Sequence, residues 1–331
     1  MSSENTEVDL GQEQSQFRSD LEKLRQAIAD VLVGQDEVID LTLAALIAGG
    51  HVLLEGPPGV GKTVLGRTLA GSLDVQYRRI QFTSDLMPAD IIGTYVVMES
   101  QGRRRFEFQH GPIFTNLLLA DEISRATPKT QAALFEALEE RSLTVANESY
   151  PLPSPFFTIA TQSLGDIEGT FPVPETQLDR FFFKLVMNSP TGGDLETILG
   201  RTTEPAKDAG QRVVSGDRVV QMSQLARQAT IAPDVLSYAA KLVMATHADN
   251  KAAPESTRGF VLRGASPRAG QAMILTAKVL AIADGRTDVS RDDLRRVALP
   301  ALRHRVALNF EGHAQEAGID GIINDILGAV K

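Results

Sequence analysis

Two adjacent carboxylates follow a run of apolar residues in the stretch LLLADEISRA. Asp121 and Glu122 come directly after residues 117–120, which have the character of a buried strand. Burying ionised carboxylates is costly unless a cation or hydrogen-bond donors meet them. The pair therefore indicates either a site that holds a cation or an acidic strand end that faces solvent.

A second stretch, GPPGVGKT, offers a partner for these carboxylates. It matches the pattern G-x-x-x-x-G-K-[ST] and lies between an apolar run and a helical segment, as a phosphate-binding loop requires. In such a loop backbone N–H groups surround the phosphates, the lysine reaches the outer phosphates, and the hydroxyl binds Mg²⁺. A chance glycine-rich turn is the alternative. We expect nucleotide contacts from Gly56, Pro57, Pro58, Gly59, Val60, Gly61, Lys62, Thr63 and Val64.

The phosphate loop gives each carboxylate a role. The carboxyl ends of parallel strands face one crevice, so Asp121 would lie beside the nucleotide. There Asp121 and Thr63 would hold Mg²⁺, directly or through water. Glu122 would orient and deprotonate the water that attacks the γ-phosphate. Hydrolysis of ATP with Mg²⁺ is the leading interpretation.

The elements that must position these residues can be read from the hydrophobic pattern. Short apolar or β-branched runs alternate with helical segments, which predicts an α/β fold with a parallel sheet covered by helices. The runs are residues 51–56, 77–82, 116–122, 155–162 and 180–187. We expect a disordered leader over residues 1–18, a core over 19–190, a linker over 191–214 and a smaller helical domain over 215–331.

Composition narrows the class of protein. The 331 residues include no cysteine, and the five histidines have no metal-ligand spacing, which argues against disulfides and a transition-metal site. The polar start is not a signal peptide, and no apolar run approaches the roughly 18 residues of a membrane span. A net charge of −9 argues against general nucleic-acid binding. We expect a cytoplasmic protein without membrane insertion.

Six stretches in order resemble AAA+ ATPases, and the MoxR family in particular: VGQDEV, GPPGVGKT, LLLADEISRA, TIATQS, PETQLDRF and GASPRA. The resemblance covers about residues 20–331. It implies an AAA+ P-loop NTPase core with a five-stranded parallel sheet, a small all-helical lid domain, and a ring, expected to be a hexamer, with ATP at subunit interfaces. Val33 and Gly34 resemble the adenine-contacting segment; the alternative is the ordinary start of a helix.

Two arginines acquire roles from the same resemblance. Arg180 matches the arginine finger, which points into the neighbouring subunit's site and would stabilise transition-state charge there; the alternative is an ion pair with Asp179 or Glu175. Arg268 matches the sensor-2 arginine, whose contact with the γ-phosphate would couple nucleotide state to the angle of the lid. The alternative for Arg268 is a cation on a helix surface.

One position departs from the family pattern. The polar sensor after the fourth strand is usually Asn in ATQNP, whereas this chain reads ATQSL, with Ser163 and Leu164. The shorter hydroxyl reaches the attacking water less well, or only through another water, so slow hydrolysis is expected. Thr161 and Gln162 are alternatives for that contact. A nucleotide switch that does not hydrolyse is the corresponding rival function.

An inserted hairpin is expected near residues 94–114. Residues 94–99 and 103–108 can pair across a turn at Gln101–Gly102, which places Arg104, Phe106 and Phe108 on one face. Its position matches the helix-2 insertion that MoxR proteins share with chelatase motors and ring helicases. Arg103, Arg104 and Arg105 leave three interpretations open: a solvated tip, a partner contact or a nucleic-acid contact.

The resemblance implies a MoxR-type chaperone that remodels or activates a client protein, together with a von Willebrand factor A domain partner. The client is not named by the sequence. The rivals are a nucleic-acid motor and a chelatase-type motor subunit of the same ATPase group.

Overall fold

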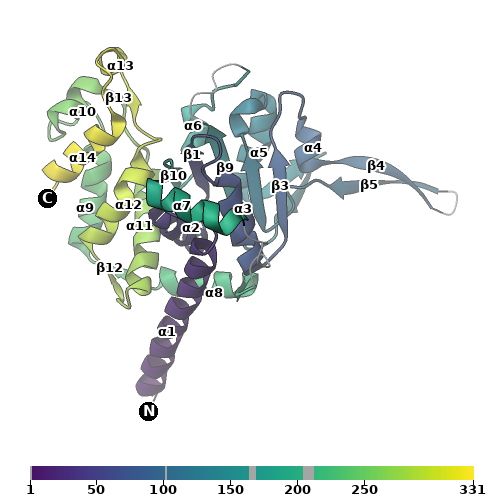
Figure 1. Ribbon diagram of the computed structural model, residues 1–331, viewed down its shortest axis with the longest axis horizontal. Helices are drawn as coiled ribbons and strands as arrows, with labels where there is room; N and C mark the ends of the chain where they lie inside the picture. Colours follow the sequence, from purple (N-terminus) through teal and green to yellow (C-terminus); the bar gives the residue numbers. More distant parts are fainter. Residues whose placement is uncertain (1, 101–102, 164–168, 204–211) are drawn as a thin grey trace.

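The computed structural model describes residues 2–100, 103–163, 169–203 and 212–331. Figure 1 shows an α/β core beside a helical domain, with a two-stranded hairpin that projects from the side of the core away from that domain. Within these ranges, no helix is both long and apolar enough to cross a membrane. Leu164 and the turn at Gln101–Gly102 lie outside the described residues.

The core contains a five-stranded sheet in which every pairing is parallel. Each strand lies in one of the five runs predicted from the sequence, with β9 extending one residue further, so the predicted sheet is confirmed. In spatial order the strands are β10 (Phe183–Val186), β1 (Val52–Gly56), β9 (Phe157–Ser163), β6 (Leu117–Asp121) and β3 (Tyr77–Gln81).

Helices cover both faces of this sheet, which explains why every residue of its strand β6 is buried. Successive residues of β6 point to opposite faces. Leu117 and Leu119 pack in one cluster with α3 (Lys62–Ser72), whereas Leu118 and Ala120 pack in another with α5 (Pro128–Glu140). The sheet therefore lies between two apolar clusters, one on each face.

The amino-terminal segment differs from the expected disordered leader. Helix α1 (Ser2–Ala29) precedes α2 (Asp36–Ala48), and Phe17, inside the expected leader, is fully buried. Phe17, Leu24 and Ile28 recur at intervals of seven and four residues, so they share one helix face and join the larger core cluster. The expected boundary at residue 18 is wrong because the apolar stripe begins before it.

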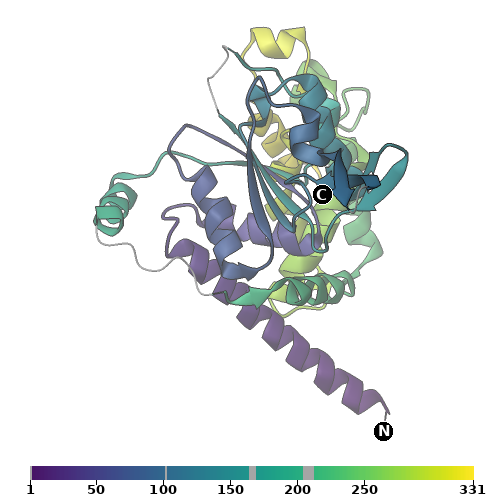
Figure 2. The same ribbon diagram turned by 90° about the vertical axis from the view of Figure 1, so that its right-hand side faces the viewer.

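The expected linker contains a helix, and the expected helical domain follows it. Helix α7 (Gly192–Thr203) occupies half of the linker, and Figure 2 shows it standing apart from the sheet. The helical domain is confirmed, and short strands of two or three residues lie between its helices: β12 (Thr230–Ile231) pairs with β14 (Asp288–Val289), and β13 (Val261–Arg263) with β15 (Ala307–Leu308). Its helices are α8 (Gly216–Arg227), α9 (Pro233–Met244), α10 (Glu255–Phe260), α11 (Pro267–Ala283), α12 (Arg291–Leu302), α13 (Phe310–Ala314) and α14 (Ile319–Ala329).

Two hairpins of the core contact each other. The expected one is formed by β4 (Gly93–Ser100) and β5 (Arg103–His110), after the short helix α4 (Pro88–Ile92). A second, which the sequence analysis missed, joins β7 (Ser142–Val145) to β8 (Glu148–Pro151). The hydroxyl groups of Tyr95 and Tyr150 lie 2.9 Å apart and connect the two hairpins.

Candidate nucleotide site

The loop between β1 and α3 has the backbone that phosphate binding requires. Gly59 and Gly61 have φ values of 84° and 102°, in the left-handed region that favours glycine. A side chain at Gly61 would come within 2.6 Å of a Leu32 methyl group, and one at Gly56 within 2.5 Å of the carbonyl oxygen of Met187. Glycine is therefore needed at these positions for both conformation and space.

Lys62 begins α3 and is almost fully buried. Its Nζ donates to the carbonyl oxygens of Gly56, at 2.5 Å, and Pro57, at 3.2 Å, and lies 3.4 Å from Ser163 Oγ. The ammonium group is thus held between the loop and the carboxyl end of β9. This is where a phosphate group in the loop would meet it.

Asp121 ends β6 and is 5% exposed. Its Oδ2 accepts from Thr63 Oγ1 at 3.3 Å and forms an ion pair with Arg79 Nη2 at 2.7 Å, while Oδ1 accepts from Thr161 Oγ1 at 2.6 Å. Arg79 and Thr161 therefore supply the cation and donor that a buried carboxylate needs. The sequence analysis gave Arg79 no role.

Glu122, the next residue, has an unusual backbone. Its φ of 60° and ψ of 52° are left-handed, a conformation that costs energy for a residue with a side chain. Its N–H donates to Thr161 Oγ1 at 2.9 Å, and its Oε1 accepts from Ser163 Oγ at 2.6 Å. The adjacent carboxylates are thus turned apart: Asp121 contacts Thr63 and Arg79, and Glu122 contacts Ser163.

The donor set fits a magnesium nucleotide. Thr63 and Asp121 bring a hydroxyl and a carboxylate oxygen side by side, and Mg²⁺ prefers oxygen ligands, taking the rest from phosphate and water. Among the described residues, no cluster of three or more His, Cys, Asp or Glu side chains could hold a metal by itself.

Val33 and Gly34 lie in the turn that connects α1 to α2. Gly34 has a φ of 74°, and a side chain there would come within 2.7 Å of the Asp194 carboxyl group of α7. The next residue, Gln35, donates from Nε2 to the carbonyl oxygen of Asn188 at 2.9 Å. The turn is thus tied to the segment after β10, and its contact with adenine remains an expectation.

Arg180 and Arg268 lie on the opposite side of the sheet from the phosphate loop. The arginines are at the amino edge, meaning the side where the parallel strands begin, and the loop is at the carboxyl edge, where the strands end. Arg180 precedes β10, whose Phe183 pairs with Val52 at the amino end of β1, whereas the loop follows the carboxyl end of that strand. A five-residue strand at about 3.3 Å per residue separates these edges by roughly 15 Å. The structure therefore does not bring Arg180 to Lys62 of the same chain.

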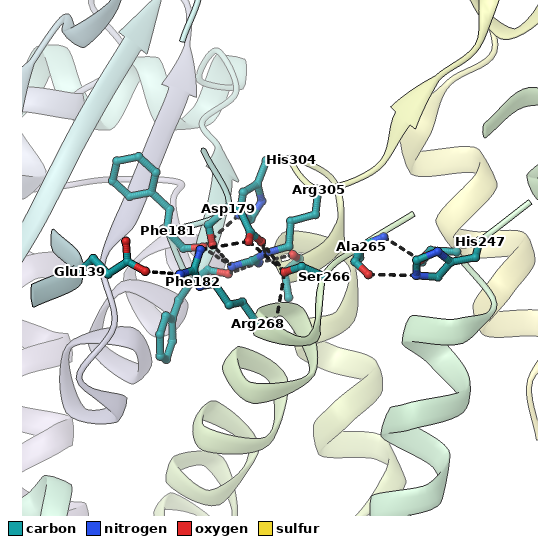
Figure 3. Close-up of polar contacts among 12 residues, drawn as sticks. Glu139, Asp179, Phe181, Phe182, His247, Ala265, Ser266, Arg268, His304 and Arg305 are labelled. Carbon is teal, nitrogen blue, oxygen red and sulfur yellow. Dashed lines mark hydrogen bonds and ion pairs between the residues drawn. The ribbon is translucent and has the colours of Figure 1, made fainter. Parts of the chain in front are cut away.

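The two arginines instead meet at Glu139. Arg180 Nη1 lies 2.5 Å from Glu139 Oε2, and Arg268 contacts the other oxygen of the same carboxylate. Figure 3 shows Ser266, Arg268 and Arg305 converging on Asp179; Arg305 Nε lies 2.7 Å from Asp179 Oδ1. The alternative partners proposed for Arg180 are wrong, because Asp179 pairs with Arg305 and Arg268, and Glu175 pairs with Arg263.

Comparisons with known proteins agree with this geometry. The family model of ATPases associated with various cellular activities (AAA) matches residues 51–183, and an AAA lid domain model matches residues 260–326. "Chaperone MoxR1" of Mycobacterium tuberculosis is 37% identical over 94% of this chain and 81% of that protein. "Protein MoxR" of Methylorubrum extorquens is 31% identical over 95% of this chain and 94% of that protein.

This chain belongs to the MoxR family of AAA+ ATPases. A solved structure from Cytophaga hutchinsonii, provisionally named an ATPase, has the same fold, with a TM-score of 0.90 and 33% identity over 99% of this chain and 98% of that one. In this MoxR-family chain the AAA match contains the phosphate loop, both carboxylates and Arg180, and the lid match contains Arg268 and Arg305.

Proposed function

We propose that this MoxR-family protein is an ATP-hydrolysing chaperone that works as a ring, expected to be a hexamer, and acts on a client protein with a von Willebrand factor A domain partner. The observation that carries the ATPase part is the meeting of Lys62, Thr63, Asp121, Glu122 and Ser163 at the carboxyl edge of one sheet. The relative named "Chaperone MoxR1" supports the chaperone part.

In the proposed reaction each residue has one task. The loop and Lys62 bind the phosphates, and Thr63 with Asp121 holds Mg²⁺, which neutralises charge that develops on the transferred phosphoryl group. Glu122 takes a proton from the attacking water, and Ser163 orients the Glu122 carboxylate through their 2.6 Å hydrogen bond. The left-handed backbone at Glu122 keeps its side chain apart from the metal-binding carboxylate of Asp121.

Arg180 and Arg268 are proposed to act on the nucleotide of a neighbouring subunit. Their position at the amino edge supports this, because they share Glu139 and Arg180 lies about one strand length from the loop of its own chain. For Arg268 this replaces the simpler expectation that a lid arginine touches the phosphate of its own subunit. Rings built from one repeated heterologous contact would place the amino edge of one subunit against the carboxyl edge of the next.

A mixing experiment tests whether these arginines act on the nucleotide of a neighbouring subunit. Lys62→Ala and Arg180→Ala proteins should each lack ATPase activity, and their 1:1 mixture should recover part of it. In the mixture about a quarter of the interfaces would join a subunit with an intact phosphate loop to a neighbour with an intact arginine. A Lys62→Ala and Arg268→Ala mixture should recover activity in the same way. The matched control is a Lys62→Ala and Glu122→Gln mixture. Both changes affect the phosphate-loop side of an interface, so every interface would be defective and the mixture should stay inactive. No recovery in either arginine mixture would mean that the arginines act within their own subunit.

The β4–β5 hairpin is proposed to contact the client. It exposes Val97, Met98 and Phe106 to solvent, and Phe106 is 77% exposed. A Glu122→Gln protein, which should bind ATP without hydrolysing it, can be used to retain partners in the presence of ATP, with Phe106→Ser in the same background as the comparison. Retention of a von Willebrand factor A domain protein that depends on ATP would support the proposal. Stimulation of the ATPase by single-stranded DNA, lost when Arg104 and Arg105 are neutralised, would favour the nucleic-acid rival.

A further inference from the structure

A cavity of about 520 Å³ lies between the core and the helical domain. Its apolar walls include Leu138, Phe182 and Ile274, and His51 lines its floor. What distinguishes this cavity is its charge, because five arginines and two carboxylates line it in a chain whose net charge is −9. The arginines are Arg141, Arg180, Arg227, Arg268 and Arg305; the carboxylates are Glu139 and Asp179.

The two carboxylates account for three of the five arginines. Arg305 is buried and is held by Asp179, and Arg180 and Arg268 share Glu139. Arg141 and Arg227 remain. Among the described residues neither forms an ion pair, and the guanidinium group of Arg141 donates to the backbone carbonyl of Gly49.

The remaining two arginines line the same cavity, where their positive charges oppose each other. Partial burial lowers the pKa of Arg141, and the positive charge of Arg227 lowers it further. His51 does not change this balance, because burial lowers its pKa to about 3 and both ring nitrogens are engaged, by Thr158 N–H and by the Leu138 carbonyl. Two neighbouring cations on the wall of a cavity are stabilised by an anion between them.

We infer that this cavity is a phosphate-binding site in which Arg141 and Arg227 hold a polyphosphate anion. The planar, always-charged guanidinium group binds phosphate oxygens in pairs, which an isolated chloride or a single hydroxyl cannot match. The volume lies within the usual range for small-molecule sites, and a local positive potential concentrates anions even on an acidic protein. None of the roles assigned to Arg180 and Arg268 requires Arg141 or Arg227.

Two sources can supply this anion, and both present the same phosphate groups. It is either a free polyphosphate, such as the phosphate chain of a dissolved nucleotide, or the phosphate chain of the nucleotide in a neighbouring subunit. The second source rests on the proposed function, because Arg180 and Arg268 line the same cavity and are proposed to face that nucleotide. The first source does not need ring assembly or ATP hydrolysis.

Direct binding tests the free anion. Tripolyphosphate is titrated calorimetrically, in EDTA and at protein concentrations where the chain is monomeric, into Lys62→Ala protein, so that the weakened phosphate loop is the same in every arm. Adding Arg141→Gln and Arg227→Gln should lower the affinity by about 10- to 100-fold, since each lost hydrogen bond to a charged group matters strongly. The matched control is Arg212→Gln with Arg263→Gln, two exposed arginines whose loss changes net charge equally.

ATPase measurements on the assembled protein test the second source. Arg227→Gln in an otherwise unchanged chain should lower kcat at least several-fold with little change in the affinity for nucleotide, and Arg227→Lys should restore part of the loss. Arg227 serves better than Arg141 here, because replacing its side chain removes no described hydrogen bond, whereas Arg141 also holds Gly49. Urea unfolding of each variant checks that the fold is intact.

The outcomes separate the two sources and the two proposals. Loss of tripolyphosphate binding in the double variant assigns a free-anion site, even if the chain proves unable to hydrolyse ATP. Unchanged or absent tripolyphosphate binding together with a lower kcat for Arg227→Gln assigns the neighbour's nucleotide. If tripolyphosphate affinity and kcat both match the controls, the inference is overturned, while recovery of activity in the Lys62→Ala and Arg180→Ala mixture would still support the proposed ring.

Discussion

The two edges of the parallel sheet carry opposite chemistry. At the carboxyl edge the carboxylates of Asp121 and Glu122 meet hydroxyl groups, Arg79 and the phosphate loop. At the amino edge arginines outnumber carboxylates, and His51 is buried between β9 and α5. One edge is suited to hold a metal with its phosphates, and the other to contact phosphate from outside.

In the proposed reaction neither edge is a complete catalytic site by itself. Phosphoryl transfer needs a metal and a base on one side, and cations that stabilise transition-state charge on the other. The sheet separates these two sets by the length of a strand, so one subunit cannot bring them together by moving side chains. The proposed reaction therefore requires assembly, and separate changes at the two edges should have different consequences.

Glu122→Gln should give the largest effect at the carboxyl edge. Removing the base while keeping the size of the side chain should lower kcat by about 100- to 10,000-fold and leave ATP binding nearly unchanged. Steady-state phosphate release and nucleotide titration measure the two quantities. The control is Glu13→Gln on the exposed part of α1. Unchanged turnover for Glu122→Gln would remove the catalytic role of Glu122.

The two edges also differ in how well the sequence predicts them. The carboxyl edge follows from local patterns, because the loop, the metal carboxylate and the base lie next to strands that the apolar runs identify. The neighbours of Asp121 do not follow, because the contact with Arg79 depends on the strand order, which places β6 between β3 and β9. Alternation in YRRIQF puts Arg79 and Gln81 on one strand face, and that was the available signal.

The amino edge depends on contacts between distant parts of the chain. Arg268 and Arg305 reach Glu139 and Asp179 across more than 80 residues, and no periodicity or motif encodes such pairs. The β7–β8 hairpin, which the sequence analysis missed, did have a local signal in the sequence at Asn147. Ala146 and Asn147 both have positive φ, which is typical of a two-residue hairpin turn, and Asn at the second position favours it.

Acid should destabilise the protein through the amino edge. Burial lowers the pKa of His51 to about 3, below the 6.5 of an exposed histidine, so the unfolded chain binds a proton that the folded chain does not. The cost appears as the pH falls below 6.5 and grows until about 3. From pH 7 to pH 5 it should reach about 2 kcal/mol of unfolding free energy.

Urea unfolding of His51→Gln at several pH values measures this contribution. The variant should lose less stability than the wild type between pH 7 and pH 5, and His304, whose pKa burial also lowers, is the same in both proteins. His313→Gln, at an exposed position, is the control. Parallel curves for wild type and His51→Gln would mean that His51 is protonated in the folded protein.

Ser163 is a second residue at the carboxyl edge whose replacement should change kcat. Ser163→Ala removes the 2.6 Å hydrogen bond to Glu122 and should lower kcat about 10-fold, since one hydrogen bond to a charged group is lost. Ser163→Asn places an amide at the usual family position and should raise kcat if the short hydroxyl limits the rate. Single-turnover hydrolysis separates these effects from product release. No rise for Ser163→Asn would mean that the serine is not limiting.

Arg79→Gln should have the smallest effect and the opposite sign. The Arg79 guanidinium occupies Asp121 Oδ2, the same oxygen that lies 3.3 Å from Thr63 Oγ1, so it competes with a metal for that position. Because Arg79 is 43% exposed, the pair contributes only about 0.5–1 kcal/mol, which corresponds to about a two- to five-fold lower Mg²⁺ requirement for ATP hydrolysis in the variant. Mg²⁺ titrations of the ATPase rate measure it, with Arg78→Gln, at the adjacent exposed position of β3, as the control. A higher Mg²⁺ requirement would instead show that Arg79 orients Asp121 for the metal, and the cation at this edge would then assist the metal rather than replace it.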